Sequence, residues 1–128
     1  TVEINLLGQI YLTREIVPVM KKQKSGTIVN IISQAGIYGR ASKTIYNATK
    51  FAMTGFTKSW EMELKEFGIR VIGVYPGKMS TEMFAKLGIN KKMDDAVSTN
   101  SVAKTIKFIL SLPEDTTIPE IGIKHVKN

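Results

Sequence analysis

Two short runs of apolar, mostly β-branched residues constrain the fold of this chain more than any other feature. They span 27–32 and 70–75, and each is typical of a strand that is covered on both faces. A long segment with helical periodicity, 43–67, lies between them and ends at Gly68, a residue suited to the position after a helix. A strand, a helix and a second strand in this order predict parallel strands joined by a right-handed crossover.

The rest of the chain extends this pattern. Segment 2–23 has helical periodicity with Pro18 inside it, and segment 101–112 is an amphipathic helix whose apolar residues are expected to face mostly inward (Val102, Ile106, Phe108, Ile109 and Leu112). Segment 118–126 alternates apolar and polar residues, as a half-buried final strand does. Loops are expected over 33–42 and 88–97, and a short helix over 80–87. We therefore predict an α/β fold: a partial Rossmann-like, doubly wound parallel sheet of about three strands with flanking helices.

The start of the long central helix carries a pair of residues with chemical potential. Tyr46 and Lys50 are four residues apart, so their side chains share one face of a helix. An ammonium beside a phenol favours the ionised form, so such a tyrosine can release and take up a proton near neutral pH. Taken alone, each residue also has a structural interpretation, Tyr46 as a half-buried aromatic and Lys50 as a solvated lysine.

Other motifs accompany this pair in a fixed order. Ser33 lies thirteen residues before Tyr46 at the end of the first strand, Asn5 lies in the first helix, and Pro76-Gly77 ends the second strand. With Thr81 further on, these motifs resemble the short-chain dehydrogenase/reductase family of the classical type, over nearly the whole chain. The resemblance implies an NAD(P)-dependent dehydrogenase/reductase that interconverts a ketone or aldehyde and an alcohol by hydride transfer.

The resemblance also implies a role for each residue. Tyr46 would be the catalytic acid/base, and Lys50 would favour its ionised form and bind the nicotinamide ribose. Ser33 would hold the substrate oxygen, and Asn5 would hold a water molecule near Lys50. Backbone and side-chain groups after the second strand would meet the nicotinamide; the matching residues are Pro76, Gly77, Met79 and Thr81. Met79 departs from the branched aliphatic residue that is usual there.

The resembled family runs to about twice this length, so we expect 1–128 to be a single partial domain, the carboxy-terminal half of the fold. No glycine-rich phosphate-binding loop of the form G-x-x-x-G-x-G is present, so the choice between NAD and NADP cannot be read. We expect the isolated chain to be inactive without the missing half. In the family, helices matching 2–23 and 43–67 form a dimer contact, which predicts a homodimer. Segment 88–97 corresponds to the family's mobile substrate-binding loop.

An alternative function is a non-catalytic remnant, or a dimerising interaction module, that retains the fold. The ending over 118–126 lacks the family's common Asp-Gly-Gly sequence, which favours a general carbonyl or alcohol enzyme over the ketoreductases of fatty-acid synthesis.

Composition excludes several other classes. The net charge is +7, but the lysines are spread along the chain without interleaved aromatic residues, so we predict a solvated surface and no nucleic-acid binding. No apolar run approaches the roughly 18 residues of a membrane span. The chain has no cysteine, which excludes disulfides and thiolate metal sites and fits a cytoplasmic protein. No residue spacing suggests a metal site, and the only histidine, His125, is expected to pack or face solvent.

Overall fold

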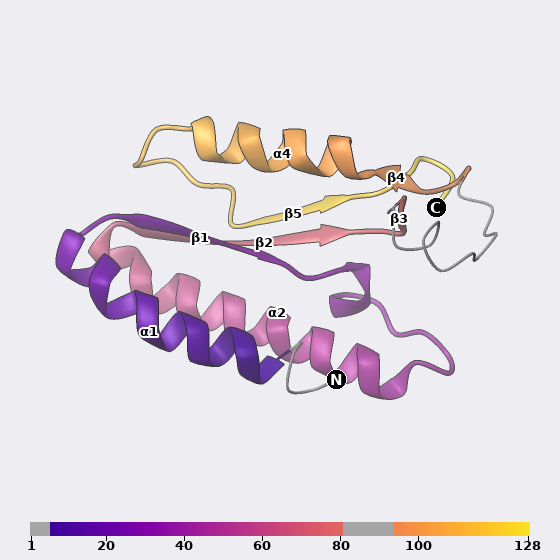
Figure 1. Ribbon diagram of the computed structural model, residues 1–128, viewed down its shortest axis with the longest axis horizontal. Coiled ribbons are helices and arrows are strands. Elements are labelled where there is room, and N and C mark those ends of the chain that lie inside the picture. The colour runs from indigo at the N-terminus through magenta and orange to yellow at the C-terminus, as the bar shows by residue number, and fades with distance from the viewer. Residues whose placement is uncertain (1–5, 81–93) are drawn as a thin grey trace.

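The computed structural model describes residues 6–80 and 94–128, which form a parallel sheet with helices on both sides (Figure 1). Short 3-10 turns follow the first strand and the second long helix. In chain order the elements are α1 (Gly8–Gln23), β1 (Gly26–Ile31), η2 (Gln34–Gly36), α2 (Thr44–Leu64), η3 (Lys65–Phe67), β2 (Ile69–Pro76), β3 (Met79–Ser80), β4 (Val97–Ser98), α4 (Thr99–Ser111) and β5 (Glu120–Ile123).

The main sheet has the strand order β1-β2-β5, and both of its ladders are parallel. Helices α1 and α2 cover one face and α4 covers the other, as Figure 1 shows. This arrangement confirms the predicted three-stranded, partial doubly wound sheet. Within the described residues, β1 pairs only with β2, which makes β1 an edge strand.

The core beneath α1 and α2 follows from the period-two alternation of the strands. Along β2, Ile69 and Val71 pack with Val17 of α1 and Leu64 of α2, and none of the four side chains is more than 3% exposed. Further along, Tyr75 packs with Ile32 of the segment after β1 and with Met53 of α2. Buried apolar area of this kind is the dominant stabilising contribution, roughly 1.5–3 kcal/mol for each large side chain.

The opposite face of β2 packs against α4. Ile72 and Val74 contact Ile109 of α4, and all three side chains are fully buried. The prediction that Phe108 of this helix faces inward was wrong, because Phe108 is 56% exposed. Successive residues of a helix are turned by about 100°, so Phe108 cannot face the sheet when its neighbour Ile109 does.

The prediction that the first strand is covered on both faces was also wrong. Ile31 is 53% exposed, whereas Ile28 on the other face is buried. The cover on this face is incomplete along the edge strand β1. Val29, on the same face as Ile31, still packs against the cluster of Ile72, Val74 and Ile109, whereas Ile31 takes no part in that packing.

Several element boundaries differ from the predictions. Gly68 adopts the left-handed conformation expected after a helix, with φ of 73°. A small parallel ladder pairs β3 with β4, so Ser80 belongs to a strand, while the remainder of the predicted helix 80–87 lies outside the described residues. The final strand ends at Ile123 and not at Val126. These shifts leave the order of the main elements unchanged.

Candidate active site

A cavity of about 520 Å³ opens at the carboxyl ends of β1 and β2. This is the edge where open α/β sheets bind ligands. The cavity brings together most of the residues that the sequence singled out: Ser33, Tyr46, Lys50, Pro76, Gly77 and Met79. Asn5 and Thr81 lie outside the described residues, so their predicted roles stay predictions.

Tyr46 reaches the cavity because α2 begins at this edge of the sheet (Figure 1). Its side chain is 41% exposed, and the Nζ atom of Lys50 lies 5.6 Å from the centroid of its ring. The Nζ atom of Lys43 lies 5.7 Å from the same centroid. Tyr46 therefore has an ammonium within cation–π range in the turn before it and another in the turn after it.

Ser33 occupies the sharp turn between β1 and η2. Its backbone has φ of 141° and ψ of 155°, a combination that residues other than glycine rarely adopt and that costs on the order of 1–3 kcal/mol. The Ser33 Oγ accepts a hydrogen bond from the backbone N–H of Ala35 at 3.0 Å. That bond uses a lone pair, so the hydroxyl proton can still be donated to a group in the cavity.

Asn47 ties the loop after Ser33 to α2. Its side chain is 7% exposed and donates from Nδ2 to the carbonyls of Ala35 and Tyr38, each at 2.9 Å. Its Oδ1 accepts from the backbone N–H of Arg40 at 3.1 Å. One buried amide thus satisfies three backbone groups of the loop, which fixes the loop beside Tyr46.

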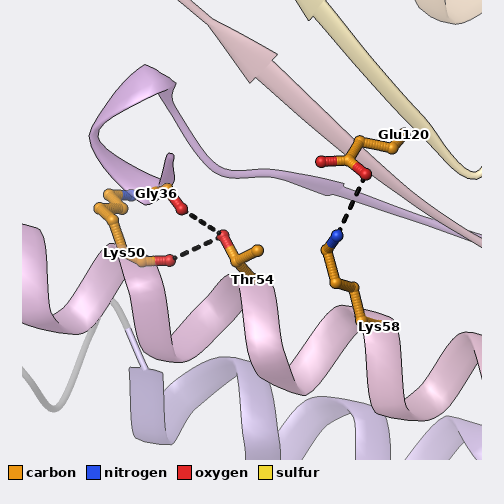
Figure 2. Close-up of polar contacts among 5 residues, drawn as sticks. All are labelled: Gly36, Lys50, Thr54, Lys58 and Glu120. Carbon is orange, nitrogen blue, oxygen red and sulfur yellow. Dashed lines mark hydrogen bonds and ion pairs between the residues drawn. The ribbon is translucent and has the colours of Figure 1, made fainter. Parts of the chain in front are cut away.

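A second attachment lies about two turns further along α2 (Figure 2). The Thr54 hydroxyl contacts the carbonyl of Gly36 at 3.0 Å and that of Lys50 at 3.2 Å. A Cβ atom on Gly36 would lie 2.7 Å from Thr54 Oγ1 and 3.0 Å from the Lys50 carbonyl oxygen. Only glycine lets the loop approach the helix this closely.

Gln34 connects the same loop to the centre of the sheet. Its Nε2 donates to the carbonyl of Tyr75 at 2.8 Å, and the Gln34 side chain lines the cavity. The sequence alone did not predict a role for Gln34, Asn47 or the cations Arg40 and Lys43. These residues are close to Ser33 and Tyr46 in the sequence, which could have suggested that they lie near the site. Closeness in the sequence does not predict which side chains turn toward the cavity.

The far side of the cavity is formed by the turn after β2. Lys78 Nζ donates to Asp95 at 2.8 Å, and the backbone N–H of Val97 donates to the Lys78 carbonyl at 2.9 Å. The hydrogen bond from Lys78 lowers the pKa of the Asp95 carboxyl below its usual range. Residues 88–93 of the predicted substrate loop lie outside the described residues, and its mobility stays a prediction.

Other features of the described chain bear on function only indirectly. His125 accepts a hydrogen bond at Nδ1 from the backbone N–H of Lys127 at 3.1 Å. No cluster of three or more histidine, aspartate or glutamate side chains able to hold a metal occurs within 6–80 and 94–128. None of the helices described there is both long and apolar enough to cross a membrane.

Comparison with known proteins adds an independent finding. The family model described as short chain dehydrogenase matches residues 1–92. The 3-oxoacyl-(acyl-carrier-protein) reductase FabG of Thermotoga maritima is 44% identical over 119 residues, which cover 86% of this chain and 48% of that protein. This chain therefore spans about half the length of that relative. The expectation drawn from the chain's ending stays a prediction.

Solved structures of two dehydrogenases resemble this chain over nearly its whole length. The closed form of serine dehydrogenase complexed with NADP+ matches with a TM-score of 0.88 at 26% identity, over 97% of this chain and 54% of that one. A 4-hydroxyisoleucine dehydrogenase complexed with NADH and succinate matches with a TM-score of 0.79 at 26% identity, over 97% and 55% of the two chains.

Proposed function

Because this chain belongs to the short-chain dehydrogenase family, we propose that it is the catalytic half of an NAD(P)-dependent oxidoreductase that interconverts a carbonyl compound and an alcohol. The observation that carries the proposal is the cavity in which Tyr46, with Lys50 beside its ring, meets Ser33. A proton donor, a cation and a hydroxyl converge there at the edge of the sheet where ligands bind.

In the reducing direction, the carbonyl carbon gains a hydride while the carbonyl oxygen takes the proton of the Tyr46 phenol. The Ser33 hydroxyl donates a hydrogen bond to the same oxygen and stabilises the negative charge that develops on it. The Lys50 ammonium stabilises the phenolate that remains on Tyr46. In the oxidising direction the phenolate takes the proton of the alcohol, and the hydride leaves from carbon.

The residues around the cavity fit the nicotinamide end of a dinucleotide. A bound nicotinamide would supply or accept the hydride. Lys50 has ammonium protons for ribose hydroxyls, and the segment from Pro76 to Met79 offers backbone groups for the carboxamide. The structures complexed with NADP+ and with NADH come from two relatives, so the proposal leaves the choice of cofactor open.

We further propose a homodimer through α1 and α2, in a cytoplasmic protein. Large apolar side chains project from both helices into solvent, each at least 45% exposed: Tyr11, Leu12, Val19, Ile45, Phe51 and Met62. Such exposed apolar surface is typical of an interface with another chain. Sedimentation of the chain at several concentrations checks this, and a monomer throughout would contradict it.

The test of the proposed chemistry is a Tyr46→Phe variant of the complete enzyme, in which this chain is joined to a nucleotide-binding half. General acid–base catalysis contributes about 10²–10⁴-fold, so turnover of a panel of ketones with NADH or NADPH should fall by at least about 100-fold. Tyr38→Phe is the matched control, because Tyr38 is 60% exposed and does not line the cavity. Equal turnover in wild type and Tyr46→Phe would refute the role of Tyr46.

A second candidate is a dimerising module without catalytic activity. It is favoured by the apolar surface left at the edge of the sheet, where Ile31 is 53% exposed. Calorimetry of the chain with NADH and NADPH distinguishes the two functions. Stoichiometric binding of NADH or NADPH supports the enzyme. The module is supported if the complete protein neither binds these cofactors nor turns over any ketone of the panel.

A further inference from the structure

We propose that the cavity takes a substrate that carries an anionic group, a carboxylate or a phosphate, and that Arg40 and Lys43 bind this group. This inference rests on the proposed function, because it assigns a class of substrate to the same cavity. It concerns the recognition of the substrate and not the transfer of the hydride.

The cavity carries positive charge that is only partly offset. Among the described residues, its lining contains the cations Arg40, Lys43, Lys50 and Lys78 and no aspartate or glutamate. Lys78 is paired with the Asp95 carboxylate at 2.8 Å, so its charge is offset. Within the described residues, neither Arg40 nor Lys43 lies within ion-pair distance of a carboxylate. The cavity therefore holds positive charge that the described part of the protein does not balance, and clefts lined by charge of one sign concentrate ligands of the opposite sign.

The fold also fixes the position of these two cations. The backbone N–H of Arg40 is held by buried Asn47, and Lys43 is the residue that precedes α2, so both emerge from a fixed part of the loop. The Lys43 ammonium lies 5.7 Å from the centroid of the Tyr46 ring. An anion bound by Lys43 would thus place the rest of a small molecule beside the Tyr46 phenol and the Ser33 hydroxyl.

The side chains of arginine and lysine both suit an anionic group. The guanidinium of arginine binds carboxylate and phosphate with two parallel hydrogen bonds, and the ammonium of lysine adds a further charge. The proposed function already assigns Lys50 to the Tyr46 phenolate and the nicotinamide ribose, whereas it assigns no role to Arg40 and Lys43. A molecule in which a few atoms separate the anionic group from the carbonyl carbon would fit this arrangement.

Two matched pairs of probes test the inference by turnover. Acetoacetate is compared with acetoacetamide, and dihydroxyacetone phosphate with dihydroxyacetone, in the complete enzyme. We expect at least one anionic member to have about a 10-fold higher kcat/KM than its neutral partner, which corresponds to about 1.4 kcal/mol. The variant R40Q/K43Q should remove this preference, so that the ratio of kcat/KM between the anionic and the neutral partner falls to about 1, mainly by a higher KM for the anion.

The control variant is K22Q/K104Q, which removes the same amount of charge from exposed positions on α1 and α4 outside the cavity. A preference for the anions that falls equally in both double variants would show a general effect of net charge and overturn the inference. Equal kcat/KM for the charged and neutral partners in the wild type would also overturn it, although the proposed function would stand.

Binding to the 128-residue chain itself gives a reading that does not depend on turnover. All the residues invoked lie in this chain, so acetoacetate and dihydroxyacetone phosphate are titrated into isotope-labelled Tyr46→Phe protein and followed by NMR. The anion site is supported if the anions shift the NMR signals of residues 40–43 and the neutral partners shift them less. These shifts should be absent in the triple variant R40Q/K43Q/Y46F. This result would support the site even if the complete enzyme showed no turnover. The absence of such shifts with both anions would overturn it.

Discussion

Replacing Asn47 by alanine tests how the loop that carries Ser33 is held in place. The variant loses three hydrogen bonds to the backbone, of which the one to the Ala35 carbonyl is buried and the other two are partly buried. A net contribution of roughly 1–1.5 kcal/mol for the buried bond and about 0.5 kcal/mol for each of the others gives a loss of about 2–2.5 kcal/mol. With a urea m-value of about 1–3 kcal/mol/M, the unfolding midpoint should fall by about 0.7–2.5 M.

Urea unfolding followed by circular dichroism measures this change. Asn100→Ala is the control, because Asn100 is exposed on α4 and its substitution should stay within about 0.5 kcal/mol of wild type. In the complete enzyme, Asn47→Ala should also lower kcat, because a loosened loop no longer holds Ser33 at a strained backbone geometry. A midpoint for Asn47→Ala equal to that of Asn100→Ala would refute the reasoning.

Three further predictions concern the elements around the site. Gly36→Ala should lose about 1–3 kcal/mol of stability in urea unfolding, because the new Cβ would lie 2.7 Å from Thr54 Oγ1. Gly39→Ala is the control and should change stability little, because no atom lies within 4 Å of a Cβ at that position. Equal losses in the two variants would contradict the importance of this close packing. Burial, followed by the nearby Glu120 carboxylate, raises the pKa of the Tyr75 phenol above its usual value of about 10. The unfolded chain then ionises first, so the free energy of unfolding should fall as pH rises above about 10, and Tyr75→Phe should show a shallower fall between pH 9 and 11. Arg70→Met removes the hydrogen bonds from the guanidinium to the carbonyls of Leu112, Pro113 and Thr116. The variant should lose about 2 kcal/mol of stability in the same unfolding assay. An unchanged stability would show that other contacts hold this loop.

The order of the elements and the identity of the central residues were accessible from the sequence. Periodicity separates strands from helices over long segments, and the parallel arrangement follows from the alternation of strand and helix. The spacing of Tyr46 and Lys50 places them on one face of α2 before any tertiary contact is known.

Contacts between distant segments were not accessible. The exposure of Ile31 depends on where α4 packs, and nothing near Ile31 in the sequence reports that position. The pairing of β3 with β4 joins residues 79 and 97, whose intervening segment carries no pattern that predicts a ladder. Both features are set by packing between elements and not by local preference.

The sequence by itself therefore determined the fold class and the edge of the sheet at which ligands are expected to bind, because local periodicity fixes the order of strands and helices. The tyrosine, lysine and serine expected there came from the resemblance of their ordered motifs to a known family. Only the tertiary structure decided that Asn47 and Gly36 hold the serine loop against α2 and that Arg40 and Lys43 line the cavity without a described carboxylate partner. The physical reason is that close packing and the balance of charge in a cavity depend on distances between segments that the chain brings together only when it folds.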